Sequence, residues 1–276
     1  IGATFGYIAT LAVIVLALRH GFAVLGARPS SQKNITSLPP LPYLIGEAMP
    51  YFSYGFAYMI LIFLPHLFGW LGHVPEGQTR AAAMTNIEVG LTLSMPPLIL
   101  AYGAAEHALR LFWRRVTTMQ ATTSATNVDG FGASLVDFVA KQRRIYMLIL
   151  TIFTLLAHGV FRYSLTTGWI NHWLRPSDPD QLLFIFSLSL VAYWLLGLGL
   201  FNSMFAVTLG KPQVAFRAVL WGCLVLAITG VMLSSLSFTL AAFAFVLAAL
   251  AFAAISWEET NQVLWTADYS FAAVLS

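Results

Sequence analysis

A few ionisable side chains interrupt long apolar stretches of the sequence, and these residues are the best placed to do chemistry. Glu106, His107 and Arg110 lie within one such stretch, and the spacing of Glu106 and Arg110 lets their charges pair on one helix face. Charges in an apolar environment are costly and often functional. Two interpretations stay open: a charged patch at the mouth of a cavity, or a local ion pair that shields its own charges.

A second spaced pair, His158 and Arg162, occupies the end of another apolar stretch. Arg162 can extend its guanidinium to lipid headgroups, or the pair can line a vestibule that contacts sugar hydroxyls or anionic groups. Asn202 is an amide inside a third apolar stretch, where it can hydrogen-bond a neighbouring helix or contact a sugar in a cavity. Gly197 and Gly199 precede it and permit close approach of helices.

Two further carboxylates stand where apolar helices are expected to begin. Glu47 and Glu88 would be favoured there, because the helix dipole stabilises negative charge at an N-terminus. We expect a structural role for Glu88 and retain Glu47 as a candidate for the substrate path. The substrate-path candidates are then Glu47, Glu106, His107, Arg110, His158, Arg162 and Asn202.

The sequence holds none of the motifs that mark common catalytic or cofactor sites. It has no H-E-x-x-H metal motif, no phosphate-binding loop and no G-x-S-x-G nucleophile turn. Cys223 is the single cysteine, so an intrachain disulfide and a cysteine metal cluster are excluded. The net charge of +3 is too small for a nucleic-acid-binding surface. We expect no enzyme activity, cofactor, metal or nucleic-acid partner.

The residues around these positions predict an all-α integral membrane protein with about seven transmembrane helices. Of the 276 residues, 59% are hydrophobic and 9% are charged, whereas a soluble domain carries about 25% charged residues. A spanning helix needs roughly 20 apolar residues. The predicted spans are residues 3–19, 45–70, 87–112, 145–162, 182–209, 213–234 and 237–256. Kinks are expected in the second and third spans at Pro50, Pro65, Pro96 and Pro97.

The connections between spans predict their arrangement. Gly210-Lys211-Pro212 indicates a tight membrane hairpin, because Gly suits the position after a helix and Pro the first turn of the next. The last two spans are rich in Ala and Ser and are expected to form packing surfaces. The four prolines and three serines of residues 20–42 are typical of a linker.

Lys and Arg predict the orientation, because basic residues gather on the cytoplasmic side. Of the 14 basic residues, 11 fall on the side of the 20–42 linker and three on the other, which places the linker, residues 114–144 and the C-terminal tail in the cytoplasm. The three residues expected outside are Arg80, Arg162 and Arg175.

Residues 114–144 carry two basic clusters that are candidates for contact with partners or lipid headgroups: Arg114, Arg115, Lys141, Arg143 and Arg144. From Phe131 the sequence "FGASLVDFVAKQRR" has helical apolar spacing. It predicts either a short interfacial helix whose basic end touches anionic headgroups or a helical extension into water, and both alternatives stay open.

Three stretches resemble one family of transporters. They are "GLGLFNSMFAVTLGKPQVAFRAV", "LPYLIGEAMPYFSYGFAYMILIFLPHLFGW" and the ending "LWTADYSFAAV". They resemble parts of the PelG-type exopolysaccharide exporters, which belong to the multidrug/oligosaccharidyl-lipid/polysaccharide flippase superfamily. The first stretch resembles the penultimate hairpin of these exporters, the second resembles the helix that opens their C-terminal lobe, and the third resembles their aromatic C-terminal ending. The chain departs from that pattern at Pro65-His66, where an acidic or plain apolar residue is expected.

The resemblance implies a fold and an activity. Such exporters have two six-helix lobes that move a polysaccharide or its lipid-linked precursor across the bacterial inner membrane by alternating access. By this resemblance, residues 1–19 are the last helix of the N-lobe, 20–42 the cytoplasmic linker, 43–256 the six-helix C-lobe and 257–276 a cytoplasmic tail. Because the sequence begins at Ile1, without Met, we expect it to be part of a longer chain.

The resemblance also implies partners. These are membrane lipids, the glycan, a cytoplasmic glycosyltransferase and other membrane subunits of a secretion complex, with the basic 110–144 region as the docking surface. The main alternative is a non-catalytic transmembrane scaffold subunit of a larger complex. A membrane-embedded transferase is a weaker alternative, because it needs an acid/base or metal cluster that the sequence does not display.

Overall fold

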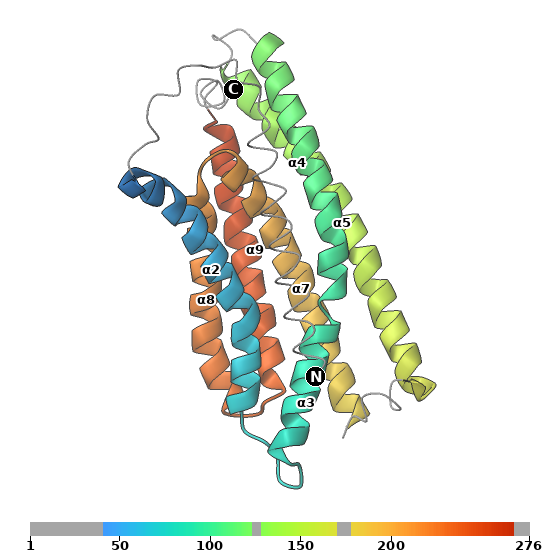
Figure 1. Ribbon diagram of the computed structural model, residues 1–276. Coiled ribbons are helices and arrows are strands. Elements are labelled where there is room, and N and C mark those ends of the chain that lie inside the picture. The colour runs from blue at the N-terminus through green and yellow to red at the C-terminus, as the bar shows by residue number, and fades with distance from the viewer. Residues whose placement is uncertain (1–40, 123–127, 170–177, 268–276) are drawn as a thin grey trace. The chain divides into compact units, whose positions relative to one another are not determined.

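The computed structural model describes residues 41–122, 128–169 and 178–267. Within these ranges the protein is helical and has no β-strand. The chain divides into two compact units, Ile1–Ile45 and Gly46–Ser276, and the description below concerns the second. The helices, labelled as in Figure 1, are α2 (Leu41–Leu71), α3 (Arg80–Leu93), α4 (Pro96–Thr122), α5 (Val128–Thr166), α7 (Pro179–Thr208), α8 (Pro212–Ser234) and α9 (Leu240–Trp265).

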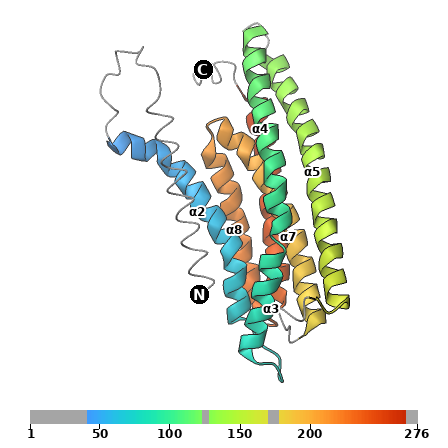
Figure 2. The same ribbon diagram turned by 45° about the vertical axis from the view of Figure 1, so that its right-hand side comes forward.

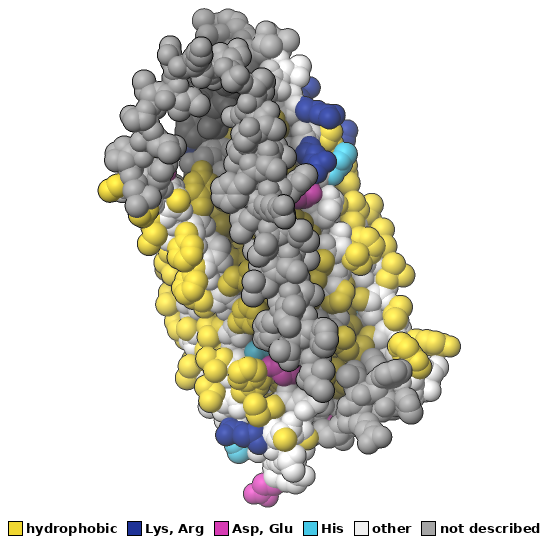
Figure 3. Space-filling model, viewed as in Figure 1, with side chains coloured by type: hydrophobic (Ala, Val, Ile, Leu, Met, Phe, Trp, Pro, Cys, Tyr) yellow, Lys and Arg dark blue, Asp and Glu magenta, His cyan; other side chains and the backbone are white. Residues whose placement is uncertain are grey.

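Six helical segments of the described residues are long and apolar enough to cross a membrane. They are Ile45–Leu71, Arg80–Met119, Gly130–Thr166, Pro179–Thr208, Pro212–Ser234 and Leu240–Trp265. Many large apolar side chains lie on the surface, and in Figure 3 hydrophobic side chains are spread over the described surface between its two ends. The predicted first span, 3–19, and most of the predicted linker lie outside the described residues, so the total of seven stays a prediction.

The third predicted span is two helices in series rather than one. α3 ends at Leu93 and α4 begins at Pro96, and the hydroxyl of Ser94 between them donates to the Leu91 carbonyl at 2.8 Å. Proline lacks a backbone N–H and disfavours helical geometry in the preceding residue, so the helix stops here. The kink predicted in this span is therefore a complete break. Pro50 and Pro65, in contrast, lie inside the uninterrupted helix α2.

Helices α7, α8 and α9 form the most extensive contacts in the unit, and Figures 1 and 2 show them side by side. Glycines let them approach closely: a Cβ added at Gly199 of α7 would lie 2.5 Å from the Phe252 ring of α9. Similarly, a Cβ at Gly230 of α8 would lie 2.4 Å from the Phe68 ring of α2. The alanines of α9 are largely buried, so the prediction of a packing surface is confirmed there.

The turn between α7 and α8 has the predicted geometry. Gly210 has φ 73°, a left-handed conformation that favours glycine. The Gly210 N–H donates to the Val207 carbonyl and the Lys211 N–H to the Ala206 carbonyl, both at 3.0 Å. This pair of bonds is a Schellman motif, and Pro212 begins α8 immediately afterwards. The membrane hairpin predicted from Gly210-Lys211-Pro212 is confirmed in its local geometry.

Helices α4 and α5 pack along each other and reach beyond the α7–α8 turn in both ribbon views (Figures 1 and 2). The 39 residues of α5 measure about 58 Å at the α-helical rise, against roughly 30 Å for the hydrocarbon core. The stretch from Phe131 to Arg144 is part of this continuous helix, and Phe131, Leu135 and Val139 are buried. The alternative of a separate interfacial helix is therefore wrong, because these apolar residues pack within the protein.

Helix α9 also runs further than predicted, since it ends at Trp265 rather than near residue 256. Thr260 and Leu264 in this added part are buried. A Cβ at Gly132 of α5 would lie 3.0 Å from the Trp265 carbonyl, so the two helices nearly touch there. The first half of the predicted tail 257–276 is thus a packed helix. The polar sequence "SWEETNQ" is typical of a solvent-exposed segment, which is why the sequence predicts a tail here.

Candidate functional site

A buried guanidinium joins three helices near the end of the unit that carries the α7–α8 turn. Arg143 of α5 is only 3% exposed. Its Nε donates to Asn202 Oδ1 on α7 at 2.8 Å, and its Nη2 donates to Asn261 Oδ1 on α9 at 3.1 Å. Its Cζ lies 3.6 Å from the centroid of the Trp257 ring, a cation–π contact. We name Arg143, Asn202, Trp257, Thr260 and Asn261 the Arg143 cluster.

The partners of Arg143 are all uncharged. No carboxylate of the described residues lies within ion-pair distance of it. Thr260 Oγ1 donates to the backbone carbonyl of Asn202 at 3.1 Å, which adds a second link between α7 and α9. The Asn202 Nδ2 group is buried without a hydrogen-bond partner. Burying a charge costs several kcal/mol, and here only neutral oxygens and an aromatic face offset that cost.

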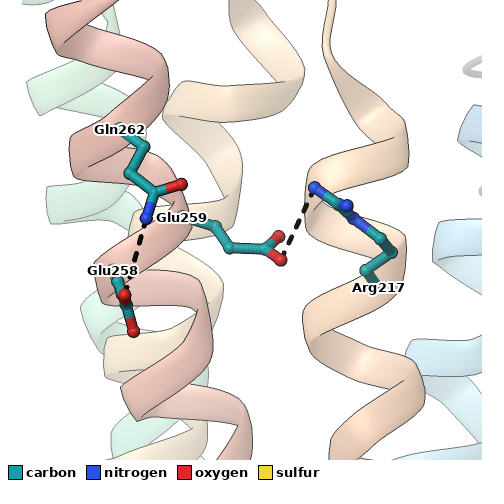
Figure 4. A network of polar contacts seen from close by, with 4 residues as sticks. All are labelled: Arg217, Glu258, Glu259 and Gln262. Carbon is teal, nitrogen blue, oxygen red and sulfur yellow. Dashed lines mark hydrogen bonds and ion pairs between the residues drawn. The ribbon is translucent and has the colours of Figure 1, made fainter.

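An ion pair between α8 and α9 involves Glu259, which lies between the cluster residues Trp257 and Thr260 in the sequence. Arg217 Nη2 is 3.5 Å from Glu259 Oε1, and the two side chains are 63% and 20% exposed (Figure 4). The second carboxylate oxygen of Glu259 is buried and has no hydrogen-bond partner. Gln262 Nε2 also donates to Glu258 Oε1 at 3.5 Å. Residues 257–262 of α9 are therefore a polar segment that α5, α7 and α8 all contact.

Five tyrosines from four helices lie in one region of the unit. The Tyr54 and Tyr58 ring centroids are 6.3 Å apart, and both side chains pack in the same hydrophobic core as Tyr193. We name this set the tyrosine cluster: Tyr54 and Tyr58 of α2, Tyr102 of α4, Tyr146 of α5 and Tyr193 of α7. Tyr146 and Tyr193 are almost fully buried, whereas Tyr102 is exposed.

Aromatic rings and a serine hydroxyl lie beside this cluster. The Tyr58 ring lies 6.2 Å from that of Phe252, and the Tyr193 ring meets that of Phe245 edge-on at 5.1 Å. The Tyr54 hydroxyl lies near that of Ser203, yet neither group has a hydrogen bond of good geometry. The Tyr193 hydroxyl is likewise buried and unpartnered. The cluster therefore presents hydroxyls whose hydrogen-bonding capacity is not used within the protein.

The predicted pair in α4 is present and lies on an exposed face. Arg110 Nη2 is 3.7 Å from Glu106 Oε2, and the two side chains are 78% and 53% exposed. His107 is exposed as well. The structure thus supports the pairing inferred from the spacing, while a role in a substrate path stays a prediction.

The other candidates are scattered. His158 of α5 lies 3.4 Å from the Ser187 hydroxyl of α7 through Nδ1, and Arg162 is exposed one turn away. Glu47 is exposed near the start of α2. Glu88 lies in the third turn of α3, eight residues after its start at Arg80, so the predicted helix-start role is wrong. The sequence suggested a later start because apolar character rises only after residue 86.

The basic residues of the α4–α5 hairpin have different environments. Arg114, Lys141 and Arg144 are exposed, and Arg115 donates to the Ser134 hydroxyl at 3.2 Å. Arg115 and Lys141 line a groove of about 480 Å³ between the two helices. Arg143 is the exception, because it points into the protein. The prediction that it contacts headgroups or partners is wrong, and it instead joins Asn202.

Two features of the site were not predicted from the sequence. The polar segment of α9 was assigned to the tail, although an uninterrupted helical pattern through Val263 and Leu264 would have indicated burial. The tyrosine cluster gives no local signal, because its members are spread over residues 54–193 and meet only in the folded chain.

Fold and site together define a multi-pass helical membrane protein with an apolar core that encloses a few polar side chains. The chain matches no family model, no curated protein and no solved structure.

Proposed function

We propose that this protein moves an exopolysaccharide, or its lipid-linked precursor, across the bacterial inner membrane by alternating access. The observation that carries the proposal is the tyrosine cluster, in which tyrosines from four helices lie in one region of a span-forming unit. The resemblance of three sequence stretches to PelG-type exporters supports the same substrate class. On this proposal the protein is a transporter and performs no covalent catalysis.

The chemistry of the cluster suits a sugar. A pyranose presents an apolar face and a rim of hydroxyls, and tyrosine offers a ring face beside a hydroxyl that donates and accepts. Binding sites for small molecules are mainly apolar, with a few convergent polar groups. The unpartnered hydroxyls of Tyr193 and Ser203 are such groups. No charged side chain is needed to recognise a neutral glycan.

The Arg143 cluster would hold the unit closed at one end. It links α5, α7 and α9 through two hydrogen bonds and a cation–π contact. Alternating access requires helices to separate at one end and then at the other. Because neutral partners hold the guanidinium less tightly than a carboxylate would, such a link can open without stranding a second buried charge.

The second candidate function is a scaffold subunit. The long α4–α5 hairpin favours it, because its exposed basic residues extend beyond the spans and suit an acidic partner surface. Such a partner could be a cytoplasmic glycosyltransferase. A scaffold would need the hairpin but would tolerate loss of hydroxyls from the tyrosine cluster.

The test compares two conservative variants in cells that secrete the polymer. Tyr58→Phe removes one hydroxyl of the cluster and keeps the ring, whereas Tyr163→Phe does the same at an exposed position of α5. The proposal expects secreted polymer per unit of membrane-inserted protein to fall severalfold in Tyr58→Phe and to be unchanged in Tyr163→Phe. Equal export by both variants would favour the scaffold.

A further inference from the structure

The groove of about 480 Å³ between α4 and α5 gathers charged side chains from both helices. Arg115 of α4 reaches Ser134 of α5 across it, and the guanidinium Nη2 donates to the serine hydroxyl at 3.2 Å. Asp137, Phe138 and Lys141 of α5 line the same groove. No ion pair among the described residues engages Arg115, Asp137 or Lys141. The groove therefore holds two cations and one carboxylate, and its formal charge is +1.

The face of α5 that lines the groove changes from polar to apolar along the helix. This face carries, at intervals of three or four residues, Gly130, Ser134, Asp137, Lys141, Ile145, Leu148 and Ile152. The last three side chains are 44%, 62% and 47% exposed, and we name them the apolar stripe. An exposed apolar surface thus continues directly from the basic end of the groove.

The groove lies alongside the ends of two neighbouring spans. Arg143, two residues after Lys141, bonds to the last two turns of α7. At the other end of the groove, a Cβ at Gly132 would lie 3.0 Å from the carbonyl of Trp265, the last residue of α9. Lys141 precedes Ile145 by one helical turn, a rise of about 6 Å, which matches a headgroup layer of about 5–7 Å. Lys141 is therefore placed to meet lipid phosphates when the apolar stripe faces acyl chains.

We propose that this groove binds an anionic phospholipid with a hydroxyl-bearing headgroup, such as phosphatidylglycerol, whose acyl chain lies along the apolar stripe. Arg115 and Lys141 donate to the phosphodiester, and its single negative charge balances the formal charge of the groove. Asp137 accepts a hydrogen bond from a headgroup hydroxyl and repels a phosphate of higher charge. The apolar stripe rises about 10 Å along the helix and contacts the first part of the acyl chain.

The juxtaposition of groove and apolar stripe favours a lipid over other anions. A free phosphate would use the two cations but would gain nothing from the apolar stripe. An acidic protein surface would meet Arg114 and Arg144 as readily, since both are exposed on the same hairpin. A phospholipid uses the cations and the apolar stripe together. The inference depends on the helical membrane fold and goes beyond glycan transport, because it is independent of the cargo.

The test is native mass spectrometry of the full chain in detergent, titrated with phosphatidylglycerol or phosphatidylethanolamine. We expect phosphatidylglycerol to bind severalfold more tightly. Arg115→Gln with Lys141→Gln should weaken its binding by more than about tenfold, since each lost charge contributes about fivefold. Arg114→Gln with Arg144→Gln removes the same charge from exposed positions that do not line the groove. This control pair should leave the affinity nearly unchanged.

Equal losses in the two double variants would indicate diffuse charge attraction and overturn the site. Unchanged phosphatidylglycerol binding in Arg115→Gln with Lys141→Gln would also overturn it and leave the groove to an acidic protein partner. Glycerol 3-phosphate should not displace the lipid at equal concentration, and displacement would replace the lipid by free phosphate.

Asp137→Asn tests the choice of headgroup. It should raise the affinity for phosphatidic acid relative to that for phosphatidylglycerol, because the carboxylate that repels the more highly charged phosphate is removed. An unchanged ratio of the two affinities would contradict the role of Asp137. Since lipid binding is measured on purified protein without transport, the site can be supported even where the export experiment fails.

Discussion

Arg143 Nε lies 2.8 Å from Asn202 Oδ1, and this bond ties α5 to the last two turns of α7. The same guanidinium reaches Asn261 on α9 and stacks on Trp257. One charged side chain therefore holds three spans, and removing any one of its neutral partners leaves the charge buried with fewer contacts.

Asn202→Ala should destabilise the protein by about 1.5–3 kcal/mol, because a buried hydrogen bond to a charged group is lost. Arg143→Met combined with Asn202→Leu should cost less than the sum of the two single changes, since no charge is then stranded. Thermal unfolding in detergent measures both. Arg144→Met is the control at an exposed neighbouring position, and an equal loss of stability there would contradict a special role for Arg143.

Gly199→Ala should destabilise the contact of α7 with α9 by about 1–3 kcal/mol, because the added Cβ would overlap the Phe252 ring. Gly103→Ala in α4 should be neutral or slightly stabilising, since nothing lies within 4 Å of the new Cβ. The measurement is again the unfolding midpoint. If Phe252→Leu fails to relieve the Gly199→Ala defect, the overlap is not its cause.

The side of the membrane is tested with single cysteines in a Cys223→Ala background. Glu76 is exposed in the connection between α2 and α3, and Gln213 is exposed in the first turn of α8, at the opposite end of the spans. The distribution of basic residues predicts that Glu76→Cys reacts with an impermeant maleimide added outside intact cells. Gln213→Cys should react only after the membrane is opened. The reverse pattern would invert the proposed orientation.

Changes at Glu106 and Arg110 should each cost less than about 1 kcal/mol of stability, because an exposed ion pair is screened by water. The double change Glu106→Gln with Arg110→Gln should export as much polymer as the unmodified protein if the pair only shields its own charges. Loss of export by the double variant at normal protein levels would instead support a place in the substrate path.

The spans of the fold could largely be predicted because apolar run length and turn chemistry are local properties. Gly210-Lys211-Pro212 indicated its Schellman turn directly, and the spacing of Glu106 and Arg110 indicated their pairing. The end of α9 could not be predicted in this way, because Thr260 and Asn261 are polar. They pack inside the protein because Thr260 hydrogen-bonds the Asn202 carbonyl and Asn261 accepts a hydrogen bond from Arg143. Those partners lie 58 and 118 residues away in sequence.

The candidate site was predicted only in part. Asn202 was identified as an unusual amide in an apolar run, with a neighbouring helix as one expected partner, and the structure supplies Arg143 as that partner. Arg143 itself was grouped with Arg144 because both end a basic run. Adjacent residues on a helix point about 100° apart, so the run divides between an interior and an exterior face, which sequence proximity hides.

The most direct test of glycan passage is photo-crosslinking from within the tyrosine cluster. A benzophenone amino acid is introduced in place of Tyr58, and separately in place of the exposed Tyr163, in cells that are secreting polymer. After illumination, the proposal predicts that the protein carrying the probe at position 58 gains covalently attached carbohydrate and that the one carrying it at position 163 does not. Normally inserted protein with no carbohydrate attached at position 58 would contradict the account.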